Sequence, residues 1–485
     1  MRKNPKIVII GAGMSGICLV IKLRQQGFTD ITVLEKAKTL GGTWRENRYP
    51  GLTCDVPSHA YTYSFAPNPD WTHLYPPREE IFQYFERVFR EHGVDQHTHF
   101  NEAVTACRYD DTTQQWQITT PRQTYTADFL FAATGILHHP VYPDIPGRDS
   151  FQGISMHTAR WQDGVALQNK RIGVIGTGST ASQLIPELIN TAGTDVTVFQ
   201  RTAQWIIHTP NPPFSERTRR LFRRFPCLMR LNRSLTLWMM AQTSVGLTGQ
   251  SWKDRQAYRL IETLAKNSLK RVRNPALRKT LTPDYKPGCK RLILNATFYP
   301  AIQKANAHVV TEKIVAIEPE GVRTADGKLH ALDVLVYATG FDPVAYMRPM
   351  DFSGKGGLRI DEVWNKKLTA YRSLMVPGFP NFFCMVGPNS PIGNFSIISV
   401  TEAQTDWCIQ LIKLWQREKL ARVECTDTAL QNWRSMLQRK MKNTVWASGC
   451  VSWYLDKDGD PITWPDSLGQ WKKMMSKVEL QDFVR

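Results

Sequence analysis

Apolar and polar positions alternate along this 485-residue chain in a pattern that predicts strands followed by helices. Short apolar runs, typical of buried strands, end in glycine-rich turns or polar loops, and longer stretches with helical spacing follow them. The expected strands include 6–10, 31–34, 171–175 and 195–199, and two more that lead into Ala-Thr-Gly at 133–135 and 338–340. This alternation predicts an α/β fold with parallel sheets.

Two of the expected strands run directly into a dinucleotide fingerprint. Glycine at such turns lets backbone N–H groups and a helix N-terminus approach a pyrophosphate. Because each fingerprint stands between a strand and a helix, we predict two Rossmann-type dinucleotide-binding domains. The residues concerned are Gly11, Gly13, Met14, Ser15 and Gly16 in the first fingerprint, and Gly176, Thr177, Gly178, Ser179 and Thr180 in the second.

The residues that end the next strands differ between the two sites. The strand after the first fingerprint ends in Glu35, and the strand after the second is followed by Gln200, Arg201 and Thr202. A carboxylate accepts hydrogen bonds from free ribose hydroxyls, whereas a guanidinium pairs with a 2′-phosphate. We therefore predict FAD at the first site and NADPH at the second, a combination that indicates an electron-transfer enzyme.

The order of these motifs predicts that the second domain is inserted into the first. Each fingerprint is followed by one Ala-Thr-Gly segment, and prolines at 140, 143 and 146 mark an irregular linker between the two units. We expect an FAD-binding domain over 1–150, an NADP-binding domain over 151–335 with a helical insertion at about 212–285, and the rest of the FAD-binding domain with an aromatic tail over 336–485.

Cysteine usage and the chain start bear on location. Nine cysteines are scattered singly, without a Cys-x-x-Cys pair or a His/Cys cluster, so we expect reduced thiols, no metal site and a cytoplasmic protein. No apolar run typical of a signal peptide follows Met1, and no apolar stretch is long enough to predict a membrane-spanning helix.

Much of the net charge of +18 falls in the helical insertion, around an apolar stretch at 235–247 that contains Trp238, Met239 and Met240. This pattern fits peripheral contact with a membrane surface or the mouth of an apolar substrate site. The alternative is a helical insertion with a solvated basic face, since runs of charge usually mark exposed faces. Motifs that recognise nucleic acid are absent, so we expect no such partner. The flanking basic residues are Arg217, Arg219, Arg220, Arg223, Arg224, Arg230, Arg233, Lys270, Arg271, Arg273, Arg278 and Lys279.

Two further motifs carry a family resemblance. Phe151, Gly153, His157 and Trp161 stand at the FxGxxxHxxxW spacing just before the second fingerprint. A second pattern, Gly41-Gly42-Thr43-Trp44, is followed by Tyr49-Pro50-Gly51 and then by Asp55. These two patterns, both nucleotide motifs and residues 338–342 together resemble the Baeyer–Villiger monooxygenases, a branch of the class B flavoprotein monooxygenases. The resemblance covers nearly the whole chain. Gln162 departs from the pattern, since the family usually has Pro or Asp there.

The resemblance implies a reaction centre at Arg291. In this family an arginine beside the flavin stabilises a peroxyflavin anion that attacks a ketone carbonyl, and the matching segment here is 288–294. A guanidinium stays charged, so it can stabilise negative charge on the peroxide and on the adduct. Asp55 resembles the carboxylate that holds this arginine, and Lys290 would join Arg201 at the 2′-phosphate. The family associates His157 with domain coupling rather than proton transfer.

The same resemblance implies the reaction and the remaining site residues. One oxygen atom of O₂, the co-substrate, would be inserted beside the carbonyl of a small hydrophobic ketone to give an ester or lactone. The sequence identifies neither the ketone nor the oligomeric state. Further positions expected at the cofactors are Gly42, Thr43, Trp44, Tyr61, Val104 and Gln183, and Trp453 and Tyr454 of the tail are candidates for the substrate pocket.

Two alternatives remain open from the residues alone. A flavin monooxygenase that oxygenates sulfur or nitrogen would use a protonated electrophile and would depend less on Arg291. A pyridine-nucleotide reductase would pass electrons to a partner protein, commonly through a redox-active cysteine pair, and no Cys-x-x-Cys is present.

Overall fold

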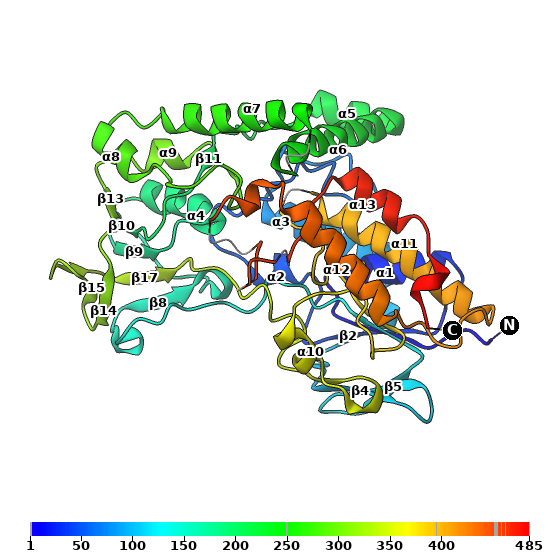
Figure 1. Cartoon of the computed structure of the whole chain (residues 1–485). Coiled ribbons are helices and arrows are strands. Elements are labelled where there is room, and N and C mark those ends of the chain that lie inside the picture. The colour runs from blue at the N-terminus through cyan, green and yellow to red at the C-terminus, as the bar shows by residue number, and fades with distance from the viewer. Residues whose placement is uncertain are drawn as a thin grey trace.

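The protein contains two five-stranded parallel sheets that lie side by side, with a layer of helices along one edge of the molecule (Figure 1). The computed structural model describes residues 2–248, 251–393, 395–450, 454–456, 458–460 and 462–484. The α/β class with two parallel sheets is the one that the strand and helix pattern predicts.

The first sheet has the order β19-β7-β1-β2-β3, with every neighbouring pair parallel. Alternate residues of β1 point to opposite faces. Ile7 and Ile9 pack in the core beneath α1 and α11, whereas Val8 and Ile10 pack against a four-stranded sheet. Both faces are covered, which is why β1 is apolar throughout. The strands are β1 Ile7–Ile10, β2 Ile31–Glu35, β3 Thr98–Phe100, β7 Phe129–Ala132 and β19 Phe382–Cys384.

The chain returns to this first unit after building the second sheet. β19 adds beside β7, and β18 adds in parallel to β4 at the edge of the four-stranded sheet. That sheet consists of β18 Asp351–Ser353, β4 Ala106–Asp110, β5 Gln115–Thr119 and β6 Thr124–Ala127. Helices on the other face are α1 Met14–Gln25, α2 Thr43–Glu46, α3 Arg78–Glu91, α11 Ile397–Gln416, α12 Asp427–Met441 and α13 Leu468–Met475, with α10 Ile360–Lys366 near β18.

The second sheet has the order β13-β10-β9-β17-β8 and is also parallel throughout. The predicted domain boundary at 335 falls inside β17, and the domain limits themselves stay a prediction. The strands of this sheet are β8 Ile154–His157, β9 Arg171–Ile175, β10 Asp195–Phe199, β13 Ala307–Val310 and β17 Val334–Tyr337. The helices beside it are α4 Ser179–Asn190 and α9 Phe298–Ala301. Two smaller sheets complete the unit: the pair β11 Ile206–Ile207 and β12 Ile293–Leu294, and the antiparallel β14 Ile314–Glu318, β15 Gly321–Thr324 and β16 Leu329–Ala331.

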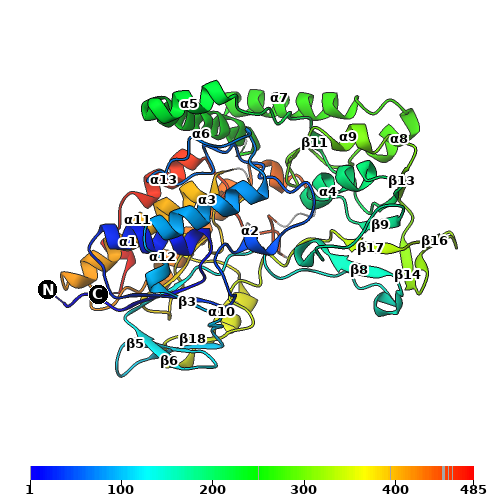
Figure 2. The same ribbon diagram turned by 180° about the vertical axis from the view of Figure 1, so that it is seen from behind.

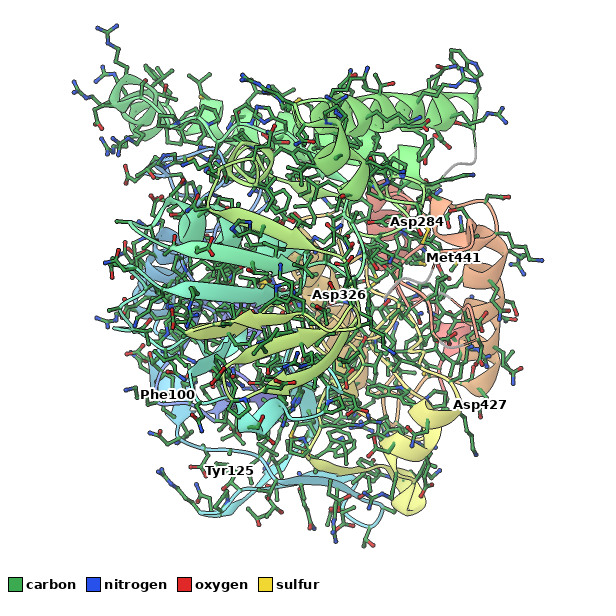
Figure 3. All side chains as sticks on the ribbon, turned by 90° about the vertical axis from the view of Figure 1, so that its left-hand side faces the viewer. Phe100, Tyr125, Asp284, Asp326, Asp427 and Met441 are labelled. Carbon is green, nitrogen blue, oxygen red and sulfur yellow. A yellow bond between two sulfur atoms is a disulfide. The ribbon has the colours of Figure 1, made fainter. Side chains whose placement is uncertain are left out.

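The predicted insertion consists of four helices: α5 Glu216–Arg224, α6 Pro226–Thr248, α7 Trp252–Leu269 and α8 Pro275–Thr280. The first three form a layer along the top of the molecule, which Figure 2 shows from behind. Leu247 and Ile261 from the inner side of this layer pack with Met441, Trp446 and Tyr454. Figure 3 accordingly shows Asp284, which follows α8, on the same side as Met441 of α12. No helix in the described part of the chain has the length and apolar character needed to cross a membrane.

Candidate active site

The first fingerprint forms a glycine-lined turn between β1 and α1. Gly11 has a φ of +106°, and a Cβ on it would lie 2.7 Å from the Ala133 carbonyl oxygen. Gly13 precedes α1 without a side-chain cap, so the first-turn N–H groups of Met14, Ser15 and Gly16 face no capping side chain. Gly42 lies opposite, and a Cβ on it would come within 3.3 Å of the Gly13 Cα. This narrow backbone cradle fits a pyrophosphate.

Glu35 is the charged group at the first site. The residue is buried, with 4% of its surface exposed, and its carboxylate accepts hydrogen bonds from the backbone N–H of Ala12 at 2.8 Å and of Ala37 at 3.0 Å. Arg45, which the sequence did not single out, pairs with it at 3.2 Å. The carboxylate is therefore fixed at the end of β2, beside the glycine turn, where a ribose would lie.

The other residues expected at the first site lie around this cradle. Gly42 begins α2, so Thr43 and Trp44 form its first turn, and the Trp44 indole donates to the Tyr61 hydroxyl at 2.9 Å. Val104 is half-buried between β3 and β4, against the core of the four-stranded sheet. These positions fit an extended FAD.

The second fingerprint repeats the geometry with a more open rim. Gly176 has a φ of +114°, and a Cβ there would lie 2.5 Å from the Ala338 carbonyl oxygen. Gly178 precedes α4, again without a side-chain cap, and a Cβ on it would meet nothing within 4 Å among the described atoms. Ser179 and Thr180 form the first turn of α4, and the Thr177 hydroxyl donates to the Thr202 carbonyl at 2.7 Å.

Two cations meet beside this second fingerprint. Arg201 is exposed and makes no hydrogen bond or ion pair to the described residues. Lys290 lies over the Tyr285 ring at 4.8 Å. The pKa of Lys290 is lowered, mainly by partial burial and further by the nearby positive charge of Arg201. The negative charge of Asp284 acts in the opposite direction and raises the pKa of Lys290. The two cations repel each other, and Arg201 has no acidic partner among the described residues, which fits an anion such as a 2′-phosphate.

Asp55 and Arg291 form an ion pair, although 236 residues separate them. Both the Nε and Nη2 groups of Arg291 donate to Asp55 Oδ2, at 3.2 Å and 2.5 Å. The two side chains are 28% and 24% exposed. The Asp55 carboxylate raises the pKa of Arg291, so the guanidinium stays charged. The Nη1 group makes no hydrogen bond in the described part of the chain and remains a donor for a ligand.

Gln183 of α4, in the second unit, bonds to the loop that contains Asp55. Its amide donates to the Thr53 carbonyl at 3.0 Å and accepts from the Tyr49 hydroxyl at 3.1 Å. The sequence placed Gln183 at a cofactor but missed Tyr49 and Thr53 as its partners. Tyr49 and Thr53 lie within the family pattern at 41–55, which was the available signal. These bonds hold the Asp55 loop against α4 and so bring the two nucleotide sites together around Arg291.

The FxGxxxHxxxW motif lies where the chain passes between the two units. His157 ends β8, is fully buried, and accepts from the Ala159 N–H at 3.0 Å. Burial lowers the pKa of His157 to about 4, so the ring is neutral. A Cβ on Gly153 would lie 2.6 Å from the Asp333 carbonyl oxygen, while Phe151 and Trp161 pack in the cores of the second unit. Next to the motif, Arg160 pairs with Glu46 of α2 at 3.2 Å. This geometry fits a coupling role.

Tyr454 lies in the apolar cluster between the insertion and the tail. Its ring packs against Trp446 at 5.1 Å, and only 1% of its surface is exposed. Burial raises the pKa of Tyr454 to about 12, with opposing effects of Arg291 and Asp55 that place it in their electrostatic range. The other pocket candidate, Trp453, lies outside the described residues.

One prediction from the sequence is wrong in this region. Cys289 and Cys450 form a disulfide, so not all nine thiols are reduced. The two residues are 161 positions apart and become neighbours only when the tail folds over the loop that carries Lys290 and Arg291. Spacing along the chain gave no signal of it. The seven remaining cysteines are free, and the described residues contain no group of His, Cys, Asp and Glu arranged to hold a metal ion.

Several known proteins that are similar to this chain over nearly its whole length are monooxygenases. Residues 8–222 match the family described as pyridine nucleotide-disulphide oxidoreductase. The chain is 44% identical to an uncharacterized monooxygenase of Mycobacterium tuberculosis, over 99% of this chain and 96% of that protein. It is 37% identical to a Baeyer–Villiger monooxygenase of Streptomyces coelicolor, over 100% and 93% of the two chains. The crystal structure of OTEMO in complex with FAD and NADP is similar with a TM-score of 0.86 and 28% identity, over 98% and 97%.

Proposed function

The chain belongs to the Baeyer–Villiger monooxygenases, and we propose that it binds FAD and NADPH and inserts one oxygen atom of O₂ beside the carbonyl of a small hydrophobic ketone, giving an ester or lactone. The observation that carries this proposal is the ion pair of Asp55 and Arg291, held between the two nucleotide sites. FAD would lie along Gly11, Gly13, Gly42 and Glu35, and NADPH along Gly176, Gly178, Arg201 and Lys290.

Bound FAD would supply the activation of O₂, with electrons from NADPH. Arg291 would stabilise the negative charge that develops on oxygen when the ketone carbonyl is attacked, because a guanidinium held in a partly buried site needs little reorganisation. Asp55 would hold this guanidinium through Nε and Nη2, which leaves Nη1 to face the reacting atoms. Asp55 also balances the charge of Arg291, so that a lone cation is not buried.

Aromatic and apolar side chains near Arg291 support a hydrophobic ketone. Trp446 and Tyr454 pack with Leu247 and Ile261 in an apolar cluster, and Tyr454 lies within electrostatic range of the ion pair. A ketone with a polar or charged body would lose hydration there without gaining partners. The reductase alternative is not favoured, because relatives that span the whole chain are monooxygenases. A cytoplasmic location stays a prediction.

Product analysis tests the function directly. Purified enzyme with FAD, NADPH and ¹⁸O₂ is offered a panel of cyclic and long-chain ketones, and a parallel panel of alkyl sulfides and amines. We expect esters or lactones that carry one labelled oxygen atom, with NADPH consumption matched to product. Rapid sulfoxide formation with no ester from any ketone would instead support the heteroatom alternative.

A further inference from the structure

Helices α5, α6 and α7 form a layer along the top of the molecule (Figures 1 and 2). An unusual number of the apolar side chains in this layer are exposed. Of the sixteen large apolar side chains that are strongly exposed in the described part of the chain, ten belong to this layer or its connections. Apolar surface concentrated in this way marks a contact site rather than ordinary solvent exposure. The ten are Leu221, Phe225, Leu228, Leu231, Leu235, Trp238, Met239, Trp252, Leu260 and Leu264, between 39% and 65% exposed.

Helix α6 has two apolar faces, and the protein covers only one of them. Met229, Thr236 and Leu247 are buried toward the body of the molecule. The exposed residues at 228, 231, 235, 238 and 239 fall within an arc of about 100° on another side of the helix. An apolar stripe of this kind along more than three helical turns is what an interfacial helix presents to a bilayer.

The same layer is strongly basic. Residues 212–285 contain sixteen Lys and Arg but only four Asp and Glu, and so account for most of the net charge of +18. Nitrogen-tipped side chains of these helices project away from the body in Figure 3. Six of the basic residues on α5, α6 and α7 make no ion pair with any described residue, namely Arg217, Arg224, Arg230, Lys253, Arg255 and Arg259.

We propose that the α5–α7 layer docks on an anionic lipid bilayer, with the α6 stripe, Trp252 and Leu260 inserted shallowly among the acyl chains and the unpaired cations bound to lipid phosphates. Charge complementarity selects this occupant. A second copy would place the same cations face to face across a two-fold interface, which opposes association. Nucleic acid would pair with the cations but would leave the α6 stripe exposed to water.

Vesicle co-sedimentation of the full-length, FAD-loaded enzyme tests the proposal. We expect binding to phosphatidylcholine vesicles that contain phosphatidylglycerol, little binding to phosphatidylcholine alone, and release by high salt. The variant R224Q/R230Q/R255Q/R259Q should weaken binding by about fivefold for each charge removed. The variant L231S/L235S/W238S should also lose binding, although its charge is unchanged.

Matched variants on other surfaces serve as controls. V315S removes an exposed apolar side chain, and K313Q/K328Q removes exposed cations, both from the antiparallel hairpins of the second unit. These should bind vesicles like the parent, and the FAD content of every variant reports whether it is folded. Absence of sedimentation with anionic vesicles would overturn the proposal, as would equal loss in the control variants. A concentration-dependent dimer that L231S/L235S/W238S dissociates, without vesicle binding, would assign the layer to a second copy.

Discussion

The two nucleotide sites share a βα turn but differ in what surrounds it. At the first, Glu35 is 4% exposed and already holds two backbone N–H groups and Arg45, and Gly42 closes the turn from the opposite side. At the second, Arg201 is exposed and Gly178 faces open space. A closed, preorganised cradle suits a cofactor that stays through many turnovers, and an open rim with free cations suits a coenzyme that exchanges.

Arg291 stands where the two sites meet, so its removal should have the largest effect. Arg291→Ala should retain FAD and allow its reduction by NADPH, while ester formation falls by about 10²–10³ or more, because the charge that opposes the developing oxyanion is lost. Gas chromatography of ketone products measures this, and Arg273→Ala, an exposed arginine of the insertion, is the control. Wild-type ester yield from Arg291→Ala would contradict the mechanism.

Glu35→Ala tests the closed character of the first site. It leaves the Ala12 and Ala37 N–H groups without their acceptor, takes from Arg45 one of its two acidic partners, and removes the expected ribose partner. Loss of a buried, hydrogen-bonded charge costs about 3 kcal/mol or more, so FAD should bind roughly 100-fold more weakly. Fluorescence titration of the apoprotein with FAD measures it. Coenzyme affinity should change little, and equal losses of both nucleotides would indicate general unfolding instead.

Arg201→Ala tests the open site. The charge-assisted contact with a 2′-phosphate is worth about 1.5–3 kcal/mol, so the preference for NADPH over NADH should shrink by roughly 10- to 100-fold, mainly through KM. Steady-state kinetics with both coenzymes give the ratio of kcat/KM. NADH kinetics should be almost unchanged. An enzyme that uses NADH and NADPH equally well before mutation would refute the assignment of Arg201.

The remaining prediction concerns His157, between the two sites, and the stability of the fold rather than catalysis or binding. Its folded pKa is about 4, lowered by burial, whereas an unfolded histidine titrates near its ordinary value. As the pH falls below about 6.5, His157 therefore takes up a proton in the unfolded state but not in the folded state. This difference should lower the free energy of unfolding by about 1.4 kcal/mol per pH unit, down to a pH of about 4. Denaturant unfolding from pH 7 to 4.5 measures the slope. In His157→Gln the pH dependence of the unfolding free energy should be smaller by the contribution of one proton. An unchanged slope would show that His157 also takes up this proton in the folded state and is charged there.

Much of the fold and part of the site could be predicted because their signals are local. The difference between Glu35 and Arg201 is readable because the end of the second strand always lies at the same edge of a parallel sheet, beside the glycine turn. The Asp55–Arg291 pair could be expected only from the family resemblance, since no spacing rule links positions 236 residues apart.

The two fingerprints, the strands that lead into them and the sign of the charge at each expected ribose position follow from the amino-acid sequence, because neighbouring residues decide all of these. Which distant residues meet depends on how the whole chain packs. This packing paired Cys289 with Cys450 against the expectation of reduced thiols, and it placed Gln183 against Thr53. It also decided which apolar face of α6 is buried, because a helical pattern gives the spacing of a stripe but not the surface that packs against it.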